Sequence, residues 1–271
     1  MPRFITSDGT GLDYRVNGHG RPVVLLHGWG HSLEAYNEIV PELCRHYRCI
    51  SYSHRGHGQS DVPSGGYTVS QLAEDLHELI DGLHLERPVL VGHSMGGCTV
   101  YEYISKYGCS GISGFVILDM SPKPMCEGSW NLGGAGGYCV EDLNRDLALM
   151  AQDPSQFMVR MWDRILPAFS RLPADVKDYA GTILMGNNSP FALMSLWHSI
   201  NMLDHRDILG HLTVPMGYFI PETPMFAPGI EGYLRSAVSS PLTIRHFSGC
   251  SHVFPTEKPL EVAQALAEVI G

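Results

Sequence analysis

Short apolar runs that alternate with amphipathic segments are the feature of this sequence that most restricts its fold. These runs are nearly continuous, and they span residues 23–26, 49–53, 89–91, 115–118, 216–220 and 242–247. A strand that is covered on both faces needs apolar side chains on both, whereas a half-exposed strand alternates between apolar and polar residues. The runs therefore predict strands of a sheet that has helices on both of its faces.

The segments between several of these runs have the periodicity of amphipathic helices. Residues 68–83 begin with Thr68 and Gln71, the spacing of a capping box, and place their leucines and isoleucine on one stripe. Residues 95–107 and 257–270 show the same pattern. Strands and helices that alternate along a chain indicate an α/β fold with a doubly wound, mostly parallel sheet.

Residues 120–207 interrupt this alternation, because no strand is expected there and helical segments alternate with turns rich in glycine and proline. We therefore expect a core domain made of residues 1–119 and 208–271, with a helical cap inserted at 120–207. Aromatic and methionine side chains are frequent in this insertion. Each of them individually is expected to fill the interior of the cap, but as a set they indicate an apolar pocket beneath it.

Composition excludes several classes of protein. A chain of 271 residues with 44% hydrophobic side chains can fill one core, and its formal charge of −10 disfavours a nucleic-acid partner. The seven cysteines are odd in number and form no CxxC pair, which argues against a disulfide framework and a zinc site. The N-terminus lacks an apolar signal core and no apolar stretch could span a bilayer, so we expect a cytoplasmic protein without membrane contact.

The sequence GHSMGG at residues 92–97 is the strongest indication of chemistry. It follows an apolar strand and opens a helical segment, which is the context that a G-x-S-x-G nucleophile elbow requires. Gly92 and Gly96 allow the backbone to cross itself closely, and the start of the helix supplies N–H groups near developing negative charge. We interpret Ser94 as a nucleophile rather than as a small residue in a buried turn.

Together with VVLLHGWG (23–30), SYSHRGHGQSD (51–61) and FSGCSHVFP (247–255), this motif makes the whole chain resemble the α/β-hydrolase family. The resemblance implies a sheet of about eight strands and no metal or cofactor. It also implies that the main-chain amides of Trp29 and Met95 form an oxyanion hole and that His252 is the catalytic base. Four other histidines, His27, His54, His57 and His93, are expected to hold loops together.

The triad acid is where this sequence departs from the usual family pattern. Most relatives carry the acid after the strand at 216–220, but here that segment reads IPETPMFAP, with Pro224 at the expected position and Glu222 out of register. The alternative family position is the end of the preceding strand, where FVILDMSPKP offers Asp119. We therefore predict Asp119 as the acid, with Glu222 in reserve and a purely structural Asp119 as the alternative.

The resemblance implies a serine hydrolase that cleaves a small hydrophobic ester, thioester or lactone, as a monomer or homodimer. Its substrate pocket is expected to include Trp29, His93, Trp130, Trp162 and Trp197. The chain also resembles the cofactor-free dioxygenases of 3-hydroxy-4-quinolones, in which a His/Asp dyad deprotonates the substrate. These enzymes have a histidine after their serine, where this chain has Met95. A third alternative is a binding module without chemistry.

Overall fold

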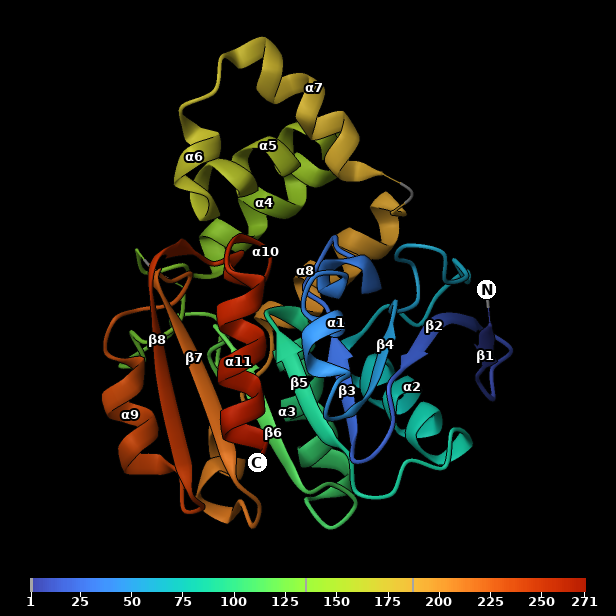
Figure 1. Cartoon of the computed structure of the whole chain (residues 1–271). Helices are drawn as coiled ribbons and strands as arrows, with labels where there is room; N and C mark the ends of the chain where they lie inside the picture. The colour runs from blue at the N-terminus through green and yellow to red at the C-terminus, as the bar shows by residue number, and fades with distance from the viewer. Residues whose placement is uncertain (1, 135, 187) are drawn as a thin grey trace.

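A mostly parallel sheet of eight strands forms the centre of the part of the chain that the structure describes (Figure 1). This structure is a computed structural model that describes residues 2–134, 136–186 and 188–271, except for the side chains of residues 183–185. The strands are β1 (Arg3–Ile5), β2 (Gly11–Asn17), β3 (Pro22–Leu26), β4 (Arg48–Tyr52), β5 (Val89–His93), β6 (Gly114–Leu118), β7 (Met216–Thr223) and β8 (Leu242–Ser251).

The strand order β1-β2-β4-β3-β5-β6-β7-β8 confirms the predicted doubly wound sheet. Strands β3 to β8 pair in parallel, whereas β1 and β2 pair antiparallel to each other and β2 pairs antiparallel to β4. All six predicted strands are present as β3 to β8, although β8 extends to Ser251. Strands β1 and β2 were not predicted, because β1 is an edge strand of three largely exposed residues and β2 mixes polar residues with apolar ones.

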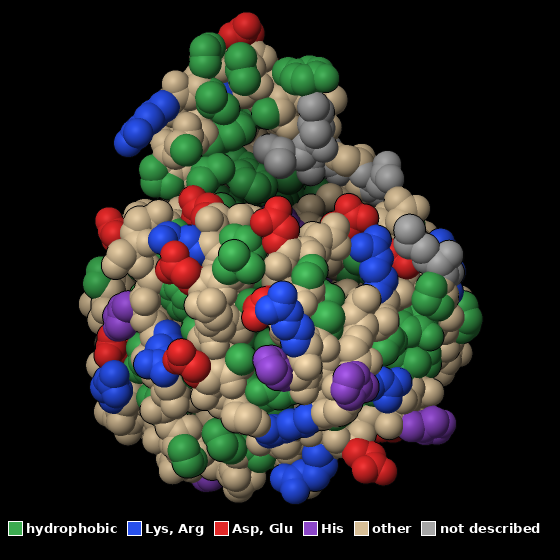
Figure 2. Space-filling view, viewed as in Figure 1, with side chains coloured by type: hydrophobic (Ala, Val, Ile, Leu, Met, Phe, Trp, Pro, Cys, Tyr) green, Lys and Arg blue, Asp and Glu red, His purple; other side chains and the backbone are tan. Residues whose placement is uncertain are grey.

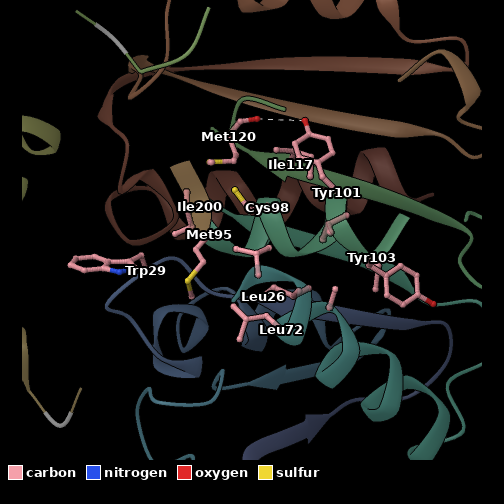
Figure 3. Packing of buried hydrophobic residues seen from close by; sticks show 14 of the residues in the cluster. Leu26, Trp29, Leu72, Met95, Cys98, Tyr101, Tyr103, Ile117, Met120 and Ile200 are labelled. Atoms are coloured by element: carbon pink, nitrogen blue, oxygen red, sulfur yellow. Dashed lines mark hydrogen bonds between the residues drawn. The ribbon is translucent and has the colours of Figure 1, made fainter. Parts of the chain in front are cut away.

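Helices cover both faces of the sheet, as the apolar runs predicted. Side chains of strand β3 alternate between two clusters of buried residues. The first cluster contains Val24 and Leu26, and the second contains Val23 and Leu25. The first cluster includes residues of α2 (Val69–Gly82) and α3 (Met95–Tyr107), and the second includes residues of α1 (Val40–Leu43) and α11 (Pro259–Ile270). Figure 3 shows part of the first cluster. Leu26 and Ile117 come from the sheet, and Met95 comes from α3. Trp29 lies at one end of the cluster in this view.

Local signals position these helices. Thr68 caps α2 by accepting a hydrogen bond from the Gln71 amide at 3.1 Å, as the capping-box spacing predicted. Two short 3-10 helices, η1 (Leu33–Tyr36) and η2 (Arg206–His211), lie in connections, and α9 (Ile230–Ala237) and α10 (Phe254–Glu257) flank β8. No helix in the described ranges has both the length and the apolar character that a membrane crossing requires.

The segment between β6 and β7 is helical in the part that the structure describes. It holds α4 (Val140–Gln152), α5 (Pro154–Ile165), α6 (Pro167–Ser170), α7 (Ala174–Met185) and α8 (Pro190–Asn201). In Figure 1, α4 to α7 stand above the edge of the sheet at which the parallel strands end, and α8 returns towards the body. Hydrophobic side chains gather on the part of these helices that faces the body (Figure 2).

Candidate active site

Ser94 lies at a strained turn between β5 and α3. Its φ and ψ angles are 53° and −118°, a backbone conformation that is costly for a residue with a side chain. The Ser94 amide donates to the carbonyl of Leu118 at 3.1 Å, and the Ser94 carbonyl accepts from the amides of Gly97 and Cys98. These bonds tie the turn to β6 and to α3, so the hydroxyl is presented at the carboxyl end of β5.

The two glycines of the motif are required by close packing. A Cβ atom on Gly92 would lie 2.4 Å from the carbonyl oxygen of Gly96, and one on Gly96 would lie 2.2 Å from the carbonyl oxygen of Leu26. Backbone atoms cannot move aside as a flexible side chain can. The sequence pattern therefore reflects the crossing of β5, α3 and β3 at this corner.

His252 and Asp119 form a buried hydrogen-bonded pair. His252 follows β8 and is 4% exposed, and Asp119 follows β6 and is 1% exposed. The distance between His252 Nδ1 and Asp119 Oδ2 is 2.7 Å. A carboxylate can only accept a hydrogen bond, so Nδ1 carries the proton and Nε2 is left with a lone pair. Ser94 and His252 line the same cavity.

Asp119 is held in place by its backbone and by the chain after β7. Its φ angle is 46°, its amide donates to the Phe219 carbonyl at 3.0 Å, and its Oδ2 accepts from the Met225 amide at 2.9 Å. The segment after β7 thus contributes a main-chain N–H group to Asp119. Glu222 lies elsewhere, because it is exposed and accepts a hydrogen bond from the Gly249 amide at 2.7 Å.

His93 joins the elbow to the loop of His252. Its Nε2 lies 2.8 Å from the carbonyl oxygen of His252, which can only accept, so this nitrogen of His93 donates. Burial lowers the pKa of His93 well below 6.5, and the neighbouring His252 lowers it further. A neutral His93 therefore connects the segment that carries Ser94 to the segment that carries His252.

The turn after β3 is held by two other histidines. His57 Nε2 accepts from the Gly30 amide at 3.2 Å, and His27 Nε2 accepts from the His54 amide at 3.0 Å. The expectation that His27, His57 and His93 hold loops together is confirmed by these contacts. His54 is packed against His27 and Tyr52 and its amide takes part in this network.

The Trp29 and Met95 amides lie at the two turns that meet beside Ser94. Met95 is the first residue of α3, and the first amides of a helix have no acceptor within that helix. Trp29 is fixed by its side chain, because its Nε1 donates to the Leu193 carbonyl at 2.9 Å and its indole ring packs against Phe157 and Trp197. The side chain of Trp29 therefore anchors the turn to α8 and α5.

Burial keeps the histidines around the site neutral. The pKa of His57 is lowered to about 4 by burial, and that of His31 is lowered to about 4 by burial and by its neighbour His252. Burial also lowers the pKa values of His27 and His54 well below 6.5. At neutral pH these rings can therefore act as hydrogen-bond acceptors and packing groups without adding positive charge.

The cavity at Ser94 has two lobes. Four residues line both: Trp29, Ser94, Trp197 and Met225. One lobe, which we name the Ile200 lobe, is further lined by Met120, Pro124, Gly134, Tyr138, Arg164, Ile200, Asn201 and Phe226. The other, the Trp162 lobe, is further lined by Gly28, His31, His93, Met158, Met161, Trp162, Ile165, His252 and Val253.

Four of the five residues predicted for the pocket lie in these walls: Trp29, His93, Trp162 and Trp197. Trp130, the fifth, is not among the residues described around either lobe. Its indole packs against Tyr233 and Arg206, and its Nε1 donates to the Lys123 carbonyl at 3.0 Å. Trp130 therefore belongs to the interior at the start of the insertion.

Several wall residues were not singled out from the sequence. His31 carried a signal, since it lies two residues after Trp29 in the turn that follows β3. Met225 and Phe226 follow the strand that usually carries the acid, but only the fold brings them over Asp119. No group of three or more metal-ligating side chains is found in the part of the chain that the structure describes.

Comparison with known proteins agrees with this architecture. A profile of the alpha/beta hydrolase fold matches residues 21–138. An esterase from Exiguobacterium antarcticum superposes with a TM-score of 0.85 at 21% identity, covering 98% of this chain and 97% of that one. A bromoperoxidase from Bacillus anthracis superposes with a TM-score of 0.82 at 24% identity, covering 96% and 95%. At these identities the two structures indicate the fold alone.

Curated relatives match over a shorter part of the sequence. A non-heme chloroperoxidase of Kitasatospora aureofaciens is 35% identical over 135 residues, which are 49% of each chain. A non-heme chloroperoxidase of Streptomyces lividans is 32% identical over 179 residues, which are 65% of this chain and 64% of that one. The match thus spans between half and two thirds of these relatives. Residues 21–138 thus match the profile of the alpha/beta hydrolase fold, and the described part of the chain has that fold.

Proposed function

We propose that the protein is a serine hydrolase that cleaves a small hydrophobic ester, thioester or lactone through an acyl-enzyme. The observation that carries the proposal is the 2.7 Å pair of His252 and Asp119, which opens into the same cavity as Ser94 at its strained turn. Serine is a poor nucleophile without an adjacent base, and an imidazole held by a carboxylate is such a base.

In the first half-reaction Ser94 Oγ attacks the carbonyl carbon of the substrate and its proton passes to His252 Nε2. Asp119 keeps the proton of Nδ1 in place and stabilises the imidazolium ion. The main-chain amides of Trp29 and Met95 hold the oxyanion of the tetrahedral intermediate, and each such donor contributes about 3 kcal/mol in well-studied hydrolases. His252 Nε2 then returns the proton to the leaving oxygen as the bond from carbon to that oxygen breaks.

In the second half-reaction water replaces the leaving group. His252 Nε2 takes a proton from the water as its oxygen attacks the acyl carbon. The second tetrahedral intermediate collapses, the bond to Ser94 Oγ breaks, and His252 returns the proton to that oxygen. The acid product leaves and the enzyme regains its starting state.

The cavity walls support a small and largely apolar acyl substrate. Tryptophan, methionine, isoleucine and phenylalanine side chains make up half of the lining residues of the Ile200 lobe and just over half of those of the Trp162 lobe. Tyr138, Arg164 and Asn201 add polar groups to the Ile200 lobe. In this proposal residues 120–207 act as a cap, since Trp162 and Trp197 come from that insertion. The cap therefore sets which substrates fit, while the core carries the chemistry.

A fluorophosphonate probe tests the nucleophile. We expect the wild type to be labelled and to hydrolyse p-nitrophenyl esters, and Ser94→Ala to lose both properties while keeping its thermal unfolding transition. Ser7→Ala is a control, because Ser7 lies on the exposed N-terminal segment and bonds to Glu78 there. Equal labelling of wild type and Ser94→Ala would remove Ser94 from the mechanism.

Halide oxidation is a second candidate, because the curated relatives are named non-heme chloroperoxidases. The proposed acyl-enzyme offers a route: hydrogen peroxide instead of water attacks the acyl carbon, the bond to Ser94 Oγ breaks, and a peroxy acid leaves that can oxidise halide. Bromination of monochlorodimedone in the presence of acetate and hydrogen peroxide tests this route. Activity that survives in Ser94→Ala would exclude the acyl-enzyme as its source.

The dioxygenase alternative stays a prediction that the same dyad permits. His252 with Asp119 could deprotonate a 3-hydroxy-4-quinolone, and the substrate anion would then react with oxygen. An oxygen electrode distinguishes the two functions directly. Rapid oxygen uptake with a 3-hydroxy-4-quinolone, in wild type and in Ser94→Ala alike, would replace the hydrolase proposal.

A further inference from the structure

The two lobes of the cavity differ in their access to His252. Ser94, Trp29, Trp197 and Met225 line both lobes, so the reacting carbonyl lies where the lobes meet. His252 lines the Trp162 lobe and is not among the residues described around the Ile200 lobe. The two halves of an ester therefore face different surroundings on the two sides of Ser94.

The chemistry of acyl transfer decides which half lies on which side. The general acid must come within hydrogen-bond reach of the leaving oxygen, whereas the acyl group needs no contact with it. Resting on the proposed hydrolase function, we infer that the leaving group occupies the Trp162 lobe and the acyl group occupies the Ile200 lobe, and that the enzyme favours esters of flat, aromatic alcohols.

The walls of the Trp162 lobe suit an aromatic ring. The rings of Trp162 and His31 are parallel within 5°, with their centroids 5.9 Å apart, and the thioethers of Met158 and Met161 lie beside them. Aromatic rings associate by offset stacking or by edge-to-face contact, and thioethers pack well against ring edges. Because its pKa is lowered to about 4, His31 contributes a neutral ring at neutral pH.

The Ile200 lobe has a different character that suits an acyl chain. Met120, Ile200 and Phe226 give it apolar walls, and Ile200 is buried in α8. Ile200 lines this lobe and is not among the residues described around the Trp162 lobe, so a larger side chain at position 200 would take space from the Ile200 lobe. Substitutions at 162 and 200 therefore separate the two halves of the substrate.

Two matched pairs of esters measure the two lobes. Benzyl acetate and cyclohexylmethyl acetate have leaving groups of similar size and reactivity but differ in aromaticity. We expect wild type to favour benzyl acetate in kcat/KM by about 2- to 12-fold, the range of one aromatic contact, and Trp162→Leu to reduce this ratio to about one. The ratio of kcat/KM for p-nitrophenyl hexanoate to kcat/KM for p-nitrophenyl acetate should stay the same in Trp162→Leu.

Substitutions of Ile200 should change the preference for acyl-chain length and leave the preference for an aromatic leaving group unchanged. Ile200→Phe should lower the ratio of kcat/KM for p-nitrophenyl hexanoate to that for p-nitrophenyl acetate by about tenfold, since overpacking a cavity wall costs on this scale. The preference for benzyl acetate over cyclohexylmethyl acetate should stay the same. If Ile200→Phe does not fold, Ile200→Ala replaces it and should raise the hexanoate ratio. Trp130→Leu is the control, because Trp130 lies outside both lobes, and both ratios should match wild type.

The outcomes separate this inference from the proposed function. A benzyl preference that Trp162→Leu leaves intact, or that Ile200→Phe abolishes, overturns the assignment of the lobes while ester hydrolysis stands. Equal turnover of the two acetates by wild type overturns the preference for aromatic alcohols. Absence of turnover with all four esters, together with absence of fluorophosphonate labelling, overturns the proposed function and the lobe assignment with it.

Discussion

His57 should make the stability of this protein depend on pH. Its side chain is 1% exposed, its Nε2 accepts from the Gly30 amide, and its Nδ1 donates to the Arg55 carbonyl at 3.2 Å. The first of these bonds requires a neutral ring. Burial lowers the pKa of His57 from 6.5 to about 4, the bond to Arg55 raises it slightly, and the charge of His31 lowers it again.

The magnitude follows from the difference between the folded and unfolded states. At pH 7.5 neither state binds the proton, whereas at pH 5.0 the unfolded chain binds it and the folded protein does not. A gap of roughly 1.5 pH units at about 1.36 kcal/mol per unit lowers the free energy of unfolding by about 2 kcal/mol. Because the folded pKa is the lower one, this stability is present above about pH 6.5 and is lost as the pH falls towards 4.

Urea unfolding at pH 7.5 and pH 5.0, followed by tryptophan fluorescence, measures this loss. His57→Gln keeps an acceptor for the Gly30 amide but cannot titrate. We expect this variant to be less stable than wild type at pH 7.5, since the bond to the Arg55 carbonyl is lost. Between pH 7.5 and pH 5.0 its free energy of unfolding should fall by about 2 kcal/mol less than that of wild type. His19→Gln changes an exposed ring and should follow wild type. A His57→Gln variant with the full wild-type loss would refute the reasoning.

Three further predictions concern the acid, a buried ion pair and the elbow. Asp119→Asn should lower kcat for p-nitrophenyl acetate by about three to four orders of magnitude, and Glu222→Gln should change it little; the reverse ranking would move the acid to the end of β7. Asp75→Asn should lower the free energy of unfolding in urea by about 3–5 kcal/mol, because the Arg55 guanidinium is 1% exposed and its Nη2 lies 2.6 Å from the Asp75 carboxylate. Gly92→Ala should yield little folded protein by circular dichroism, since its Cβ would lie 2.4 Å from a backbone carbonyl oxygen; a normal melting curve would contradict this expectation.

The sequence alone determined the parallel core and the elbow, because both depend on local patterns. Apolar runs that are buried on both faces predicted β3 to β8, and the glycines around Ser94 marked a turn in which a Cβ atom would collide with backbone. The resemblance to the α/β-hydrolase family, which has an alternative acid position at the end of strand β6, favoured Asp119 over Glu222 as the acid. Strand β1 was not predicted because it is short and lies at the exposed edge of the sheet, and β2 was not predicted because its polar residues interrupt the apolar pattern.

Only the tertiary structure decided which distant residues meet. Asp119 and His252 are 133 positions apart, and Met225 reaches Asp119 from the end of another strand. The choice between Trp130 and the other tryptophans likewise depended on the direction of each ring, which composition does not encode. Two lobes with different access to His252 arise from helices packed above the sheet, because long-range packing rather than local pattern sets the shape of a cavity.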